Sequence, residues 1–145
     1  MNDTTVKYLS ALHTALFRVT GGRIGHRLVH NEMCLLTTTG AHSGRPHTVP
    51  LLYLEDGDHL VLIASYGGRA HHPDWYYNLV ETPAATVQIF NERRPVTART
   101  ADATERRDWW PRIVAAYPDY DTYQSRTARE IPVVFLVPRN SDPPA

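Results

Sequence analysis

A chain of 145 residues is long enough to bury one substantial core, and its length favours a single domain over residues 1–145. Hydrophobic residues make up 42% of the chain, which excludes a disordered protein, and 15 Lys and Arg balance 15 Asp and Glu. This balance excludes the strong positive field with which many proteins attract nucleic acid, so any charged ligand must be recognised by local groups.

The first 30 residues have the pattern of an amphipathic helix followed by a loop. Apolar residues recur at helical spacing from Val6 to Val19, and Gly21 with Gly22 ends the pattern. Basic residues on or just after this helix allow two interpretations, packing over the end of a barrel, which we favour, or contact with an anionic membrane surface. Neither a signal peptide nor a run of roughly 20 apolar residues is evident. We therefore expect a cytoplasmic protein, peripheral to the inner face of the cell membrane if the helix binds lipid.

Six short segments have the β-branched or alternating pattern of strands and are separated by turn residues. The second and third are joined by Asp56-Gly57, a dipeptide typical of tight hairpin turns. Links of hairpin length predict a mostly antiparallel sheet or barrel with helical caps, rather than a doubly wound parallel sheet. The predicted strands cover residues 33–38, 48–54, 59–65, 86–90, 95–100 and 131–137.

Two helices interrupt the strands. Pro73 and Asp74 open the first, because proline suits the first turn and a carboxylate favours the positive helix end, and Pro83 closes it. Asp102 and Glu105 have the spacing of a capping box at the start of the second. The chain is thus divided into a helix and loop at 1–30, a barrel core at 33–137, and a Pro-rich tail at 138–145 that is expected to fray.

Conventional catalytic motifs are absent, including GxSxG, a GxGxxG after a strand, a Walker loop and HExxH. The only candidate metal ligands in proximity are His71, His72 and Asp74, whose spacing at a helix start suits no metal, so no metal site is expected. Cys34 lies in an apolar strand, where a thiol usually acts as a small hydrophobe.

Three segments are candidates for ligand binding. Residues 39–47 and 64–69 are glycine-containing loops whose backbone N–H groups can approach an anion, and the second leads into a helix N-terminus. Tyr117, Tyr120 and Tyr123 recur every three residues and would line one wall of a pocket if the chain stays roughly helical across Pro118. Residues 119–127 are a candidate for a further helical turn or two. Each segment also has a structural explanation, as a solvated loop or as residues that cover the core.

Taken in order, three segments closely resemble the deazaflavin-dependent nitroreductase family: LLTTTGAHSGRPHTVPLLYL, VLIASYGGRAHHPDWYYNL and WWPRIVAAYPDYDTYQSRTAREIPVV. The match spans residues 33 to 137. The resemblance implies a split β-barrel that binds coenzyme F-420 in a groove and passes a hydride from the reduced deazaflavin to a quinone-like or nitroaromatic acceptor. Hydride chemistry belongs to the coenzyme, so the missing catalytic motifs are expected.

The resemblance also implies a set of site residues. Those expected to contact the coenzyme are His42, Ser43, Arg45, His47, Thr48, Val49, Pro50, Ala64, Ser65, Tyr66, Asp74, Trp75, Tyr76, Tyr77 and Asn78. Those expected to border the acceptor are Ser65, Tyr117, Tyr120 and Tyr123. Of these, Ser65 and Tyr120 would donate hydrogen bonds to the acceptor oxygen as negative charge develops.

This chain departs from the family pattern at three positions. Related sequences often have Lys or Arg in place of His42 and His47, and often Lys in place of Tyr66. Imidazole gains its charge only below about pH 6.5, so Arg45 is the fixed cation left to hold the anionic tail of the coenzyme. Two alternatives remain, an oxidoreductase that uses flavin mononucleotide (FMN) and a non-catalytic deazaflavin carrier. A homo-oligomer is compatible with either.

Overall fold

The computed structural model describes residues 33–139. The predicted N-terminal helix and most of the predicted tail lie outside the described residues. Within the described range no helix is both long and apolar enough to cross a membrane.

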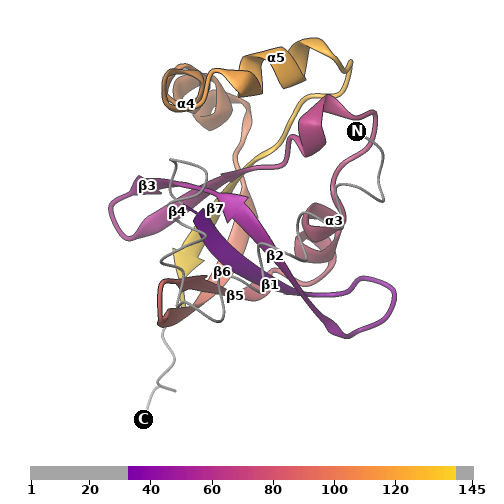
Figure 1. The fold of residues 1–145 in the computed structure, drawn as a ribbon, viewed down its shortest axis with the longest axis vertical. Coiled ribbons are helices and arrows are strands. Elements are labelled where there is room, and N and C mark those ends of the chain that lie inside the picture. The colour runs from indigo at the N-terminus through magenta and orange to yellow at the C-terminus, as the bar shows by residue number, and fades with distance from the viewer. Residues whose placement is uncertain (1–32, 140–145) are drawn as a thin grey trace.

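In the described part of the chain, a single sheet of seven strands forms the body of the fold (Figure 1). Every pairing is antiparallel, and the spatial order is β2-β1-β5-β6-β7-β4-β3. The strands are β1 (Met33–Thr39), β2 (Pro46–Leu52), β3 (Leu54–Asp56), β4 (His59–Ile63), β5 (Ala84–Ile89), β6 (Glu92–Thr100) and β7 (Val133–Pro138).

The extra strand arises because the predicted strand 48–54 divides at Tyr53. Residues before this break pair with β1, and residues after it pair with β4, at the opposite edge of the sheet. Since Tyr53 alone separates Leu52 from Leu54, the two outer strands must meet there, and the sheet must curl. This curl confirms the predicted split β-barrel and corrects the strand count from six to seven.

Within residues 33–139, three α-helices and one short 3-10 helix cover the sheet, with α4 and α5 together at one end (Figure 1). Asp102 caps α4 as predicted, because its Oδ1 accepts from the Glu105 N–H at 2.8 Å while a Glu105 carboxylate oxygen accepts from the Asp102 N–H at 3.1 Å. The helices are η1 (Tyr66–Gly68), α3 (Asp74–Glu81), α4 (Ala103–Ala116) and α5 (Asp119–Ser125). At η1 the sequence pattern predicts only a loop.

Two apolar clusters lie on opposite faces of the same strands. In β4, Leu62 points into the barrel interior, whereas its neighbours Val61 and Ile63 point outward against α4 and α5. This alternation is the period-two pattern of a strand that is covered on both faces. The outer cluster anchors Trp109 and Ile113 of α4, and it also contains Tyr120 of α5. The packing therefore presents the first turn of α5 to the end of β4.

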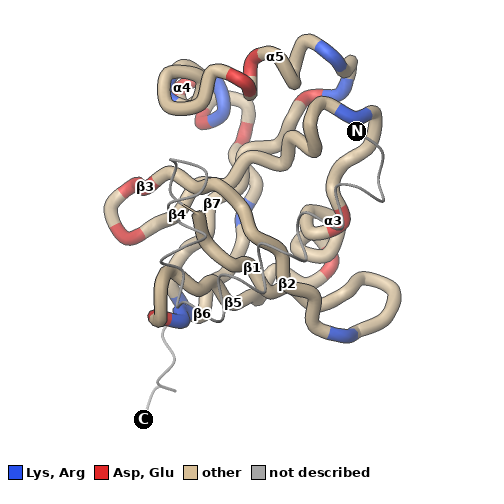
Figure 2. The backbone as a smooth tube through the Cα atoms, viewed as in Figure 1, with Lys and Arg blue, Asp and Glu red and all other residues tan. Residues whose placement is uncertain are grey.

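Basic and acidic positions both occur on several elements of the described residues (Figure 2). Cys34 is fully buried, and burial raises the pKa of its thiol to about 12. A thiol with this pKa stays protonated and unreactive at neutral pH, in keeping with its predicted role as a small hydrophobe.

Candidate functional site

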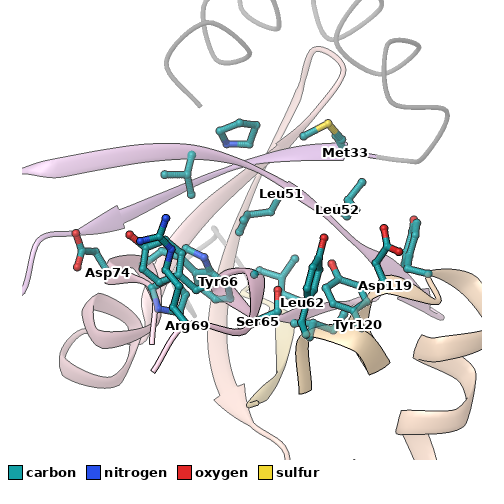
Figure 3. Close-up of a pocket in the computed structure, with 18 of the residues that line it drawn as sticks. Met33, Leu51, Leu52, Leu62, Ser65, Tyr66, Arg69, Asp74, Asp119 and Tyr120 are labelled. Atoms are coloured by element: carbon teal, nitrogen blue, oxygen red, sulfur yellow. The ribbon is translucent and has the colours of Figure 1, made fainter. Parts of the chain in front are cut away.

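A cavity of about 1250 Å³ lies between β2 and the segments that surround the end of β4 (Figure 3). Its other walls are η1, the first turn of α3, and the link between α4 and α5. Small-molecule sites commonly have volumes of about 300–1,000 Å³. The space is therefore sufficient for a large cofactor together with a second molecule.

Ten of the predicted site residues line this cavity, and they come from four separate segments of the chain. Figure 3 shows Ser65, Tyr66 and Tyr120 directed toward the same space. The ten are Thr48, Val49, Pro50, Ser65, Tyr66, Asp74, Trp75, Tyr117, Tyr120 and Tyr123.

Four predicted tail contacts lie in the β1–β2 loop or at the start of β2, outside the cavity lining. His42, Ser43, Arg45 and His47 are exposed, and the loop extends away from α4 and α5 (Figure 1). Ser43 closes the loop on itself, since its Oγ accepts from the Arg45 N–H at 3.1 Å and lies 3.2 Å from the His47 Nε2. This loop can only reach a part of a ligand that projects beyond the cavity.

Asn78 connects this loop to α3. The buried Asn78 side chain accepts from the Ala41 N–H at 2.9 Å and donates to the Thr38 Oγ1 at 3.0 Å. Because the oxygen and the nitrogen of its side-chain amide are both hydrogen-bonded to the protein, Asn78 holds the β1–β2 loop in place. It does not line the cavity.

The other predicted residues outside the lining are also engaged in protein contacts. The Tyr76 hydroxyl lies 3.0 Å from the Thr100 Oγ1, and the Tyr77 hydroxyl accepts from the His72 N–H at 3.2 Å. Ala64 is fully buried, and its carbonyl accepts from the Arg129 Nη1 at 3.2 Å.

The backbone of η1 forms the floor of the site in an uncommon conformation. Tyr66 has a φ of +48°, and Gly67 and Gly68 continue in the left-handed region at +64° and +81°. Gly68 is packed against α5 so closely that an added Cβ would lie 2.4 Å from the Tyr123 carbonyl oxygen. The η1 turn, which carries Tyr66, is therefore packed directly against α5, the helix that carries Tyr120 and Tyr123.

The three tyrosines meet in edge-to-face contacts although the helix is broken between them. α4 ends at Ala116, because Pro118 forces Tyr117 out of the helical region, and α5 begins at Asp119. The chain therefore does not stay helical across Pro118, although the candidate helix within 119–127 is present as α5. The rings still meet, since the ring centroids of Tyr117 and Tyr120 are 5.9 Å apart and those of Tyr120 and Tyr123 are 6.0 Å apart.

The hydroxyl groups that line the cavity differ in whether they form hydrogen bonds to the protein. Tyr117 donates to the Tyr53 carbonyl at 3.3 Å, so its ring is held against the strand break. Ser65 and Tyr120 have no side-chain hydrogen bond to another described residue, and no fully buried side-chain oxygen in the described range lacks a partner. Their hydroxyls therefore open into the cavity. Burial, followed by the nearby Tyr117 and Tyr123, raises the pKa of Tyr120, which keeps its proton as a donor.

Sequence reasoning missed the apolar and cationic parts of the lining. Arg69 lies with its guanidinium carbon 4.8 Å from the Tyr66 ring centroid, and Arg126 lies 5.6 Å from that of Tyr123. A glycine-rich loop with an arginine could have indicated Arg69, but only the fold brings in the others. The missed residues are Met33, Leu51, Leu52, Leu62, Ile63, Gly67, Arg69, Pro73, Ala116, Pro118, Asp119 and Arg126.

The cavity has two chemically different ends (Figure 3). Asp74, Tyr66 and Arg69 lie at one end, and Met33 and Leu52 lie at the other with Tyr120 and Asp119. An elongated ligand of mixed polarity suits the first end, and a flat apolar molecule suits the second.

Comparison with known proteins assigns the chain to a family. The family model described as F420H(2)-dependent quinone reductase matches residues 9–138. The F420H(2)-dependent quinone reductase Rv1261c of Mycobacterium tuberculosis is 41% identical over 135 residues, which cover 90% of this chain and 91% of that protein.

Two solved structures have the same fold at substantial sequence identity. One is described as an F420-H2 dependent reductase, FDR-A, with 42% identity and a TM-score of 0.66 over 72% of this chain and 93% of that one. Another, described as a domain-swapped dimer, has 35% identity and a TM-score of 0.69 over 91% of this chain and 98% of that one. The resemblance to deazaflavin-dependent enzymes is confirmed, and the chain belongs to the F420H(2)-dependent quinone reductase family.

Proposed function

We propose that this protein is an oxidoreductase that uses reduced coenzyme F-420 to reduce a quinone. The observation that carries the proposal is the pair of open hydroxyls in one cavity, with Ser65 between the polar and apolar ends and Tyr120 at the apolar end. Membership of the quinone reductase family supports the same reaction.

The lining residues fit the coenzyme in shape and in chemistry. A deazaflavin ring is flat and aromatic, and Tyr66 and Trp75 line the polar end of the cavity. The tail carries phosphate and carboxylate groups, and Arg69 borders the same end, with Arg45 in the loop beyond it. We therefore assign the coenzyme to this end, with its tail directed toward the β1–β2 loop.

When bound, the reduced coenzyme supplies a hydride. The protein's contribution is to position the acceptor and to stabilise the charge that develops on it. Ser65 and Tyr120 donate hydrogen bonds to the acceptor oxygen, and Tyr120 is a reliable donor because its raised pKa keeps it protonated. Tyr117 and Tyr123 shape the pocket and exclude water from it.

The apolar end of the cavity takes the acceptor. Met33 and Leu52 provide a hydrophobic surface for a quinone ring, and its carbonyl then meets the two hydroxyls. A nitroaromatic compound has the same combination of a flat ring and a polar oxygen, so we include it as a second acceptor class.

Two further aspects of the proposal concern assembly and location. The relative that forms a domain-swapped dimer supports a homo-oligomer. Contact of the N-terminal segment with the membrane remains a prediction, which co-sedimentation with anionic liposomes before and after removal of residues 1–20 will test.

The decisive experiment is a titration of the purified protein with coenzyme F-420, followed by mixing of the reduced complex with menadione or a nitroimidazole. Binding followed by return of the oxidised coenzyme's absorbance is the expected result. Binding without reoxidation would favour a carrier, and a protein that binds FMN but not F-420 would favour the flavin alternative; either would overturn the proposal.

A further inference from the structure

A single side chain outside the cavity holds the segment that carries Ser65 and Tyr66. Arg129 lies beyond the end of α5, more than 60 residues further along the chain than Ser65, and its guanidinium is partly buried. Its Nη2 donates to the Ser65 carbonyl at 2.6 Å, and its Nε donates to the Arg69 carbonyl at 2.8 Å. With the Ala64 carbonyl at 3.2 Å, three backbone acceptors of this segment converge on one guanidinium.

His72 provides a fourth acceptor. The Arg129 Nη1 lies 2.9 Å from the His72 Nδ1, and because arginine has only donors, this ring nitrogen must be unprotonated. Partial burial, the charge of Arg129 and the neighbouring His71 lower the pKa of His72. The rings of Tyr76 and Tyr77 pack on the same imidazole. Burial, Arg129 and His71 all favour neutral His72, which is the form that can accept.

The segment contains a turn in an uncommon backbone conformation, which its surroundings must hold. Two internal bonds are present, from the Gly68 N–H to the Ser65 carbonyl and from the Arg69 N–H to the Tyr66 carbonyl, at 2.9 and 3.2 Å. The left-handed φ of Tyr66 costs free energy that the surroundings must offset.

Arg129 is itself fixed to α5. Its N–H donates to the Thr127 Oγ1 at 3.3 Å, and its carbonyl accepts from the Gln124 Nε2 at 2.8 Å. Arg129, which does not line the cavity, therefore connects two of the cavity's walls, α5 and η1.

We infer that Arg129 is a positioning residue of the reductase site, which sets the backbone of residues 64–69 and so aims the Ser65 hydroxyl and the Tyr66 ring into the cavity, with neutral His72 as its partner. The inference rests on the proposed function for its consequence in binding, but its structural part can be measured without coenzyme.

The test compares Arg129→Lys with Arg99→Lys. Lysine keeps the charge but lacks the planar fork that reaches several acceptors. Arg99 is the control, because its guanidinium also donates through two nitrogens, to the Glu105 carboxylate at 2.7 and 2.9 Å, while these bonds involve neither Gln124 nor residues 64–69. Amide exchange of Gly68 and Arg69 in the coenzyme-free protein is the first readout.

We expect faster exchange at Gly68 and Arg69 in Arg129→Lys and unchanged exchange there in Arg99→Lys. The affinity for coenzyme F-420 should fall roughly tenfold in Arg129→Lys only. A loss of this size is about the contribution of one charge-assisted hydrogen bond. Unchanged exchange in Arg129→Lys, or equal effects in both variants, would overturn the inference. Failure of the wild-type protein to bind F-420 would instead reject the proposed function, and the exchange result would still decide whether Arg129 fixes the segment.

A pH series with His72→Asn separates positioning from general stability. The asparagine Oδ1 can replace the Nδ1 as an acceptor but does not titrate. In the wild-type protein, protection of the Gly68 and Arg69 amides, corrected for intrinsic exchange, should fall as His72 becomes protonated in acid. In His72→Asn this step should disappear. Persistence of the step in the variant would show that His72 is not the partner.

Discussion

Replacing Gly68 with alanine should separate η1 from α5. The residue has a φ of +81°, which costs an L-amino acid about 1–2 kcal/mol. The new Cβ would also lie 2.4 Å from the Tyr123 carbonyl oxygen and 3.0 Å from the Arg126 Cβ, and overpacking of this kind costs about 1–3 kcal/mol. The expected loss is about 2–5 kcal/mol, a large part of the roughly 5–15 kcal/mol that stabilises an ordinary domain.

Urea unfolding of Gly68→Ala and Gly57→Ala measures the contribution of the contact with α5. Gly57, in the β3–β4 turn, also has a positive φ, +63°, but nothing lies within 4 Å of the position that an added Cβ would take, so its replacement should cost only the conformational part. If the two variants lose the same free energy of unfolding, η1 is not packed tightly on α5 and does not form a rigid floor for the site.

Four further predictions test the site and the helix cap. Tyr120→Phe should lower kcat with menadione by about 100-fold while the coenzyme Kd stays unchanged, as measured by steady-state kinetics and titration. Arg45→Ala should weaken coenzyme binding, and this loss should diminish as salt is added to the titration. Asp119→Asn should raise kcat/KM for a sulfonated quinone more than for a neutral one, because it removes a negative charge from the acceptor end. Glu105 has a pKa lowered to about 2 by Arg99 and the Asp102 N–H, so its stabilising effect is present above about pH 4.5 and lost as the pH falls toward 2. The melting temperatures of wild type and Glu105→Gln should converge over that range.

Contrary results have distinct meanings for each residue. Full turnover of Tyr120→Phe would remove this hydroxyl from the reaction, and unchanged coenzyme affinity of Arg45→Ala would place the tail elsewhere. Equal effects of Asp119→Asn on both quinones would mean that the carboxylate does not face the acceptor. If the difference in melting temperature between wild type and Glu105→Gln does not depend on pH, the effect of the cap does not come from ionisation of Glu105.

The sequence predicts most of the elements because their signals are local. The capping box at Asp102 and the turn at Asp56-Gly57 depend on neighbours a few residues away, and both are present in the structure. The break at Tyr53 has no such signal. Strand residues on either side of it continue the same apolar pattern, although they pair with strands at opposite edges of the sheet. Pairing of this kind is decided by the tertiary fold.

The candidate site likewise has parts that the sequence predicts and parts that only the tertiary fold determines. The tyrosine spacing identified one wall even though the chain does not stay helical across Pro118, because packing against β4 and β7 brings the rings together across the break. The loop at residues 39–47 carries the expected groups, but sequence does not reveal that it folds outside the cavity. Arg129 has no local pattern at all, since its partners lie about 60 residues away.

The meeting of β2 and β3 at Tyr53 also bears on the solubility of the folded protein. An open sheet exposes two edge strands, and each can recruit a strand from another molecule and start aggregation. Here one continuous segment supplies both edges and joins them at its bend. β3 is only three residues long, and β2 contains Pro46 and Pro50, which have no N–H to donate to an incoming strand. The segment that closes the barrel thereby leaves little backbone on which an intermolecular sheet could grow.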